Sequence, residues 1–213
     1  MPLYHQRGFQ SIDETRIGCY TFFYNKQLAR FRIGCILLRF SLLGSGSSGN
    51  AIVLCSATTT ILIDNGLSFK QLSLRAEAVG IALDKLAAII VTHEHGDHVQ
   101  GIGVLTRKRP VPVYMTRGTF ENLPPSLGLL GEIELFEAGE GLQIGDMSIR
   151  SFSVSHDAAD PVGFTVRAGG AQFGLATDLG YVSHLVRNRL ANSHALVIES
   201  NHCPEMLRKG DYP

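Results

Sequence analysis

The sequence is poor in several features that would point to particular classes of protein. It has no tryptophan, and charged residues make up only 18% of its 213 residues. Lysine plus arginine and aspartate plus glutamate both count 19, so the formal charge is zero with histidine neutral. This balance argues against a broadly basic nucleic-acid-binding protein and against an acidic disordered tail.

Long hydrophobic runs and paired cysteines are also missing. The most apolar run near the N-terminus, Ile33 to Leu38, lies between Arg32 and Arg39. It is too short for a bilayer span, which needs about 20 apolar residues, and for a secretory signal, which needs about 7–15. The four cysteines are scattered and form no CxxC pair, as is typical of reduced thiols. We therefore expect a cytoplasmic protein with no membrane partner.

The sequence does contain enough apolar material for a core. Hydrophobic residues make up 45% of the chain, and at this length one domain, or one domain with an appendage, is expected. Residues 1–37 show neither helical nor strand periodicity, and basic side chains outnumber acidic ones there. We interpret residues 1–37 as an N-terminal extension outside the fold and residues 38–213 as the domain.

From Arg39 onward the pattern becomes regular. Ser68 is a good N-cap for the apolar-periodic helix 69–79, which Gly80 ends. The continuous apolar run 86–92 is typical of a strand buried on both faces. Further strands are expected at 40–44, 51–55, 60–64, 111–115 and 195–199, with several short ones within 132–177, and further helices at 99–107 and 183–191. This alternation predicts an α/β fold in which two sheets are covered by helices.

Histidines carry the strongest chemical signal. His93, His95 and His98 fall close together, directly after the buried strand, with acidic residues between them. Imidazole and carboxylate groups are ligands that divalent zinc, manganese or iron accept. Side chains two apart in an extended segment point the same way, and Gly96 would allow a sharp turn that brings Asp97 to the same cavity. The segment predicts a metal site at a strand end, where α/β sheets usually place their sites; the alternative is a solvated polar loop.

The motif His93-x-His95-x-Asp97-His98 after a hydrophobic strand resembles the signature of the metallo-β-lactamase superfamily. The resemblance covers about residues 38–213 and implies an αββα sandwich.

Three more positions match this family's pattern in order along the chain. Asp64 resembles the strand-end aspartate that supports the metal loop, His156 resembles the third histidine of the metal site, and Asp178 resembles the aspartate that bridges two ions. The resemblance therefore implies two divalent ions, zinc or manganese. The implied ligands are His93, His95 and His156 for the first ion, and Asp97, His98 and the shared Asp178 for the second.

Two short motifs resemble one subgroup of the family. Ser45-Gly-Ser-Ser-Gly-Asn50 and Glu199-Ser-Asn-His202 are similar to motifs of the YycJ/WalJ-type group, exonuclease-like relatives of ribonuclease Z. The resemblance implies that Ser47, Asn50, Glu199 and His202 line the cavity, and that Asp64 supports a ligand histidine from behind.

The implied activity is hydrolysis of phosphodiesters in single-stranded or end-processed nucleic acid. Two ions about 3.5–4 Å apart can hold a hydroxide and stabilise both the attacking and the leaving oxygen, and Asp97 would act as the catalytic residue by orienting that hydroxide. One alternative is hydrolysis of a small ester, thioester or lactam, which the same scaffold supports. Another is a metal-binding fragment without activity.

One departure from the family's pattern concerns the second ion. The family has a last histidine ligand in a loop beyond the final strand, and the sequence reaches Pro213 without it. We therefore expect the fold to be incomplete at its C-terminus and the second metal site to be weakened.

Overall fold

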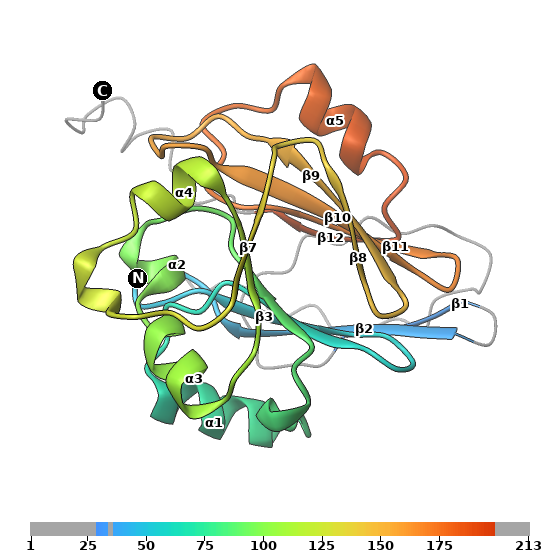
Figure 1. The fold of residues 1–213 in the computed structure, drawn as a ribbon. Coiled ribbons are helices and arrows are strands. Elements are labelled where there is room, and N and C mark those ends of the chain that lie inside the picture. The colour runs from blue at the N-terminus through green and yellow to red at the C-terminus, as the bar shows by residue number, and fades with distance from the viewer. Residues whose placement is uncertain (1–28, 34–35, 199–213) are drawn as a thin grey trace, which may run out of the picture.

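The computed structural model describes residues 29–33 and 36–198 of the chain. Two sheets lie face to face, and helices cover their outer surfaces (Figure 1). The predicted two-sheet α/β sandwich is therefore confirmed.

The first sheet is formed by the N-terminal half of the described chain. Its strands lie in sequence order, and they are antiparallel from β1 to β4 and parallel from β4 to β7. The strands are β1 (Ala29–Ile33), β2 (Ile36–Gly44), β3 (Ala51–Cys55), β4 (Thr60–Ile63), β5 (Ala88–Ile90), β6 (Val113–Thr116) and β7 (Ile133–Phe136). Because β4, β5 and β6 are parallel, the loops that follow them meet at one edge of the sheet.

The second sheet follows in the order β12-β11-β10-β9-β8. Its neighbouring strands are antiparallel except for β11 and β12, which are parallel. The strands are β8 (Gly141–Ile144), β9 (Met147–Ser153), β10 (Val162–Ala168), β11 (Ala171–Ala176) and β12 (Ala195–Ile198). The chain thus completes one sheet before it begins the other.

Two helices begin where a serine caps them. The side chain of Ser68 accepts a hydrogen bond from the backbone N–H of Gln71, as predicted, and that of Ser183 accepts one from Val186. The helices are α1 (Phe69–Ala78), α2 (Gly96–Val99), α3 (Ile102–Lys108), α4 (Arg117–Glu121) and α5 (His184–Leu190), with 3-10 turns at Leu83–Lys85 and Pro125–Leu127. None of these helices has the length and apolarity needed to cross a membrane.

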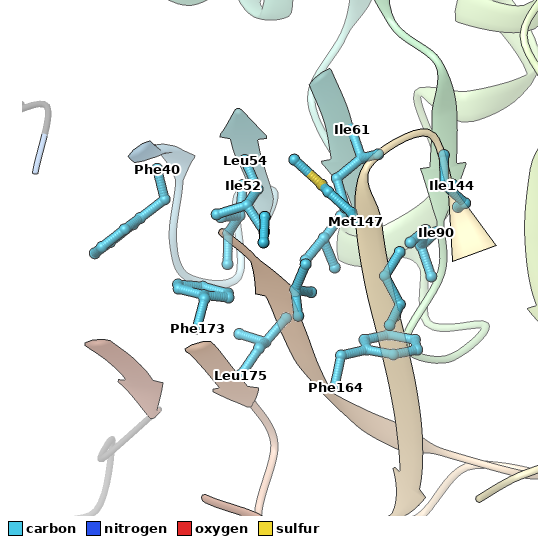
Figure 2. Close-up of a cluster of buried hydrophobic side chains, with 14 of the residues drawn as sticks. Phe40, Ile52, Leu54, Ile61, Ile90, Ile144, Met147, Phe164, Phe173 and Leu175 are labelled. Atoms are coloured by element: carbon cyan, nitrogen blue, oxygen red, sulfur yellow. The ribbon is translucent and has the colours of Figure 1, made fainter. Parts of the chain in front are cut away.

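The main core lies between the two sheets. Side chains from β2 to β5 face those of β8 to β11, with Phe164, Phe173 and Leu54 almost fully buried among them (Figure 2). Strand β3 also buries its other face, where Val53 joins a second cluster with residues of α1 and α3. This explains why β3, β4 and β5 have continuous rather than alternating apolar sequences.

Strand β1 lies in the segment that we interpreted as an extension. It pairs antiparallel with β2, and residue 38, where we drew the domain boundary, falls inside β2. The sequence of β1, ARFRI, alternates apolar and basic residues, which is the period of a strand. Our interpretation of residues 1–37 as lacking periodicity overlooked this short signal.

Candidate metal centre

The loops that bear the predicted ligands meet at one edge of the sandwich. Asp64 follows β4 and His93 follows β5, in the first sheet, whereas His156 lies between β9 and β10 and Asp178 follows β11, in the second. The carbonyl of Thr92 accepts a hydrogen bond from Val162 N–H at the start of β10, 3.0 Å away. The loop after β5 is therefore joined directly to the second sheet.

Three histidines converge at this edge. Nε2 of His93 and Nε2 of His156 each lie 3.1 Å from Nδ1 of His95. Nitrogen atoms that bind one zinc ion at about 2.0–2.1 Å in tetrahedral geometry lie about 3.3 Å apart. The three nitrogens can therefore share one ion.

A second group of possible ligands adjoins the first. His93, His98 and Asp178 also bring their ligand atoms within 4.8 Å of one another, and Nε2 of His98 lies 3.2 Å from Oδ2 of Asp178. Asp97 is not one of these three, but its Oδ2 lies 3.7 Å from Nε2 of His98.

Asp64 determines which imidazole nitrogens are free. Its Oδ1 accepts from the backbone N–H of Thr92 at 2.8 Å, and its Oδ2 accepts from the Thr92 hydroxyl at 2.7 Å. Because that hydroxyl has given its one hydrogen to Asp64, it can only accept from Nδ1–H of His93, 3.0 Å away. Nδ1 of His98 lies 2.8 Å from Asp64 Oδ2 and donates to it. In both histidines Nδ1 thus carries a proton that points away from the cluster.

His156 follows the same rule with a different partner. Its Nδ1 lies 2.9 Å from Oδ1 of Asp157 and can donate to it, which leaves Nε2 for the cluster. Metal-ligating histidines typically donate their second ring N–H in this way. The donor set therefore fits divalent ions in its chemistry as well as in its spacing.

Burial and neighbouring charges shift the pKa values of the two innermost histidines in opposite directions. His93 is 2% exposed and His98 is 1% exposed. Burial lowers the pKa of His93 to about 3, and the neighbouring His98 adds to this effect. Burial opposes the charge of His98 too, but Asp64 and Asp178 outweigh it and raise the pKa of His98 to about 10. Without an ion, His98 thus holds a proton where two carboxylates meet.

Two of the aspartates have left-handed backbone. Asp64 has φ 57° and Asp178 has φ 54°, and no other non-glycine residue in the described ranges has positive φ. Asp64 directly follows the buried strand β4, and Asp178 lies two residues after the end of the buried strand β11. Aspartate tolerates this conformation better than most residues, but such backbone costs free energy and is concentrated at functional sites.

The Gly/Ser loop between β2 and β3 packs against the metal loop through Asn50. The side chain of Asn50 accepts from Gly46 N–H at 2.8 Å and donates to Oδ2 of Asp97 at 3.1 Å. Its backbone N–H donates to the Asp97 carbonyl at 2.7 Å. Asn50 thus holds Asp97 from two sides.

The other residues expected to line the cavity have different outcomes. Ser47 is exposed in the Gly/Ser loop. Glu199 and His202 lie outside the described residues. Gly96 begins α2 with a φ outside the left-handed region, so the sharp turn that we attributed to it does not require glycine there.

Sequence reasoning missed two residues that support the site. One is Thr92, which relays the hydrogen bond from His93 to Asp64; a hydroxyl just before the first histidine was the available signal. The other is Glu94, whose Oε1 accepts from Ala159 N–H at 2.7 Å. That bond ties the loop bearing His156 to the loop bearing the other histidines.

Comparison with known sequences shows similarity to one family over most of the chain. A model of the beta-lactamase superfamily domain matches residues 59–210. The chain is 38% identical over 178 residues to exodeoxyribonuclease YycJ of Bacillus anthracis and 37% identical over 179 residues to exodeoxyribonuclease WalJ of Streptococcus pneumoniae. These alignments cover 83% and 82% of this chain but 67% and 66% of the relatives. The chain thus spans about two thirds of the length of these relatives.

Comparison with solved structures gives the same fold. Zinc-bound PqqB from Methylobacterium extorquens superposes with a TM-score of 0.62 at 18% identity, over 77% of this chain and 64% of that one. At this identity the similarity establishes the architecture alone.

Proposed function

This chain belongs to the metallo-β-lactamase superfamily, with relatives among the YycJ/WalJ-type exodeoxyribonucleases, and on that premise we propose that it is a metal-dependent nuclease. Its substrate is single-stranded or end-processed nucleic acid, with DNA favoured by the names of these relatives. The observation that carries the proposal is the convergence of His93, His95 and His156 beside His98 and Asp178.

The proposed cofactors are two divalent ions, zinc or manganese. Three histidine nitrogens surround the first position, and the second combines His98 with the carboxylates of Asp178 and Asp97. The proposed ligands are His93, His95 and His156 for the first ion, and His98, Asp97 and Asp178 for the second, with Asp178 shared between the two ions. When bound, such ions supply an activated water and positive charge beside the phosphodiester oxygens.

The side chains of this chain hold that water and the ligands in place. The proposed role of Asp97 is to orient the attacking water. The side-chain amide of Asn50 holds the Asp97 carboxylate by donating to Oδ2 at 3.1 Å. Asp64 and Thr92 hold a proton on Nδ1 of His93 and of His98, which leaves Nε2 of each histidine as the ligand atom; on His98 a bound ion would take the place of the Nε2 proton that the metal-free residue holds. Each role needs a particular hydrogen bond, so each can be removed separately.

The test uses single-stranded DNA labelled at either its 5′ or its 3′ end. The metal-stripped chain, supplied with zinc or manganese, should release mononucleotides or short products, and the label position gives the polarity. The variant carrying His93→Ala and His95→Ala should lose hydrolysis together with bound metal, measured by elemental analysis after dialysis. Lys70→Gln, on the exposed surface of α1, should change neither.

Two outcomes would contradict the proposal. Full retention of metal by the double variant would exclude these histidines as ligands. Hydrolysis of a small ester, thioester or lactam, without cleavage of any nucleic acid, would favour the alternative enzyme class on the same scaffold.

A further inference from the structure

The segment that follows Asp178 has an unusual surface composition. Residues 179–198 contain no aspartate or glutamate, although the whole chain has equal numbers of acidic and basic residues. The same segment contains Arg187 and Arg189. The segment that leads away from the candidate metal centre therefore has a positive formal charge.

Large apolar side chains are also exposed there. Tyr181 is 64% exposed, Val182 is 54% exposed and Leu185 is 43% exposed. They lie within five consecutive positions, at the start of α5 and in the loop before it. The described core does not bury these three side chains, so core packing does not explain why they are apolar.

Two contacts fix this loop at the rim of the metal centre. At its beginning, Oδ2 of Asp178 lies 3.2 Å from Nε2 of His98. Two residues later, Gly180 N–H donates to the carbonyl of Ser155 at 2.7 Å, and Ser155 immediately precedes His156. Tyr181 therefore follows directly after backbone that is bound to the loop of a candidate ligand.

Helix α5 continues the same surface away from the site. His184, Arg187 and Asn188 are exposed and spaced three and four residues apart, so they share one face of the helix. In residues 36–198 the one ion pair of a lysine or arginine with a carboxylate joins Arg117 to Glu121. Arg187 thus has no carboxylate partner within that range and can contact an anion.

We propose that Tyr181, Val182 and Leu185 form a platform on which the terminal bases of single-stranded DNA stack, and that Arg187 contacts its backbone phosphates. This inference rests on the proposed nuclease function. Aromatic side chains beside a positively charged surface bind single strands because every base offers a flat face and every linkage a negative charge. The bound single-stranded DNA would then run from α5 across Tyr181 to the metal ligands.

The test measures binding without hydrolysis. Fluorescence anisotropy of a labelled oligothymidylate of about 15 nucleotides is recorded with the metal-stripped protein in EDTA, so that no strand is cut. Tyr181→Ala should weaken binding by about 10-fold, whereas Tyr181→Phe, which keeps the ring, should bind within about 2-fold of the wild type. Arg187→Gln should weaken binding and lower the dependence of log affinity on log salt by about 0.7.

A matched control lies on the opposite side of the molecule. Leu74 on α1 is 52% exposed, and α1 covers the outer face of the first sheet whereas α5 covers the second (Figure 1). Leu74→Ala should bind the oligothymidylate as the wild type does.

The outcomes separate this inference from the nuclease proposal. Binding that depends on the ring of Tyr181, in a chain that cuts no nucleic acid with metal, would support the platform and refute the nuclease. Hydrolysis by a chain whose Tyr181→Ala variant binds and cuts normally would refute the platform alone. The platform is also refuted if Tyr181→Ala separates a dimer into monomers without changing DNA affinity, because the surface would then be an interface between copies.

Discussion

At the scale of single residues, one proton position decides whether His93 can bind metal. The hydroxyl of Thr92 stands between Asp64 Oδ2, 2.7 Å away, and Nδ1 of His93, 3.0 Å away. The Asp64 carboxylate sets the direction in which this hydroxyl donates its hydrogen. That direction in turn sets the tautomer of His93. A buried hydroxyl therefore controls a ligand that it does not itself supply.

We predict that Thr92→Val, which keeps the shape but removes the hydroxyl, weakens metal affinity by about 10–100-fold. Thr92→Ser keeps the hydroxyl and should stay close to the wild type. Competition with a chromophoric chelator measures both affinities. Equal affinities of the valine and serine variants would show that the hydrogen bond does not orient His93.

The proton on His98 makes the stability of the metal-free protein depend on pH. Its pKa is raised from 6.5 to about 10 in the fold, so the folded state binds this proton more tightly than the unfolded state does. The resulting stabilisation is fully present below pH 6.5 and is lost as the pH rises through about 10.

Urea unfolding of the metal-stripped chain between pH 6 and pH 10 should therefore show falling stability with rising pH in this range. His98→Gln should remove most of that slope, whereas the exposed His184→Gln should keep it. A slope that is unchanged in His98→Gln would assign the titration to another group.

At the scale of elements, three loops approach so closely that glycine is required between them. A Cβ added to Gly66 would lie 1.8 Å from the carbonyl oxygen of Asp97, and one added to Gly101 would lie 1.9 Å from that of Leu67. These loops follow β4 and β5, and Asn50 joins the third loop to them. The metal loop is therefore held by backbone contacts as well as by side chains.

We predict that Gly66→Ala displaces the metal loop, lowers the free energy of unfolding by at least about 2 kcal/mol and reduces metal content. Gly96→Ala is the matched control in the same region, because a Cβ there meets nothing within 4 Å. Thermal unfolding and elemental analysis of both variants decide the point. Similar losses in both variants would show that the clash between a Cβ at Gly66 and the Asp97 carbonyl is not the cause.

The elements also show which parts of the structure a sequence reveals. Helix α1 was predictable because its N-cap, periodicity and terminal glycine are all local signals. The predicted helix 99–107 begins instead at Ile102, after the short α2, because Gly101 N–H donates to the carbonyl of Asn65 rather than to that of the residue four positions before it. That contact joins residues far apart in sequence, so no local pattern could indicate it.

The candidate site was predictable to a similar extent. The histidines and aspartates have characteristic spacings, and the family resemblance placed His156 and Asp178 with them. The roles of Thr92 and Glu94 depend on hydrogen-bond partners in other loops. Threonine and glutamate occur in many surroundings, so the sequence alone did not distinguish them.

At the scale of the whole molecule, the candidate ligands connect the two sheets. His93, His95 and His98 come from the first sheet's loops, and His156 and Asp178 from the second's. An ion bound by both sets stabilises the packed state over any state in which the sheets separate, as any ligand of the native state does.

Saturating zinc should therefore raise the thermal midpoint of the wild type by about 5–10 °C over that in EDTA, for an ion about 100-fold above its Kd. In His156→Ala the increase should be much smaller, because the first position loses its ligand from the second sheet. Differential scanning calorimetry with and without zinc measures both shifts. An equal shift in the variant would place the stabilising ion within one sheet's loops.

The order in which the chain builds its two sheets has a practical consequence. The described strands of the first sheet end at Phe136 and those of the second begin at Gly141, with a turn at Gly139 between them. A cut between Gly139 and Glu140 would give two continuous pieces, each with one sheet and part of the ligand set. Because the main apolar core also lies between the pieces, a divalent ion bound by both would strengthen their association rather than create it. Free metal should therefore lower the protein concentration at which the halves reassemble.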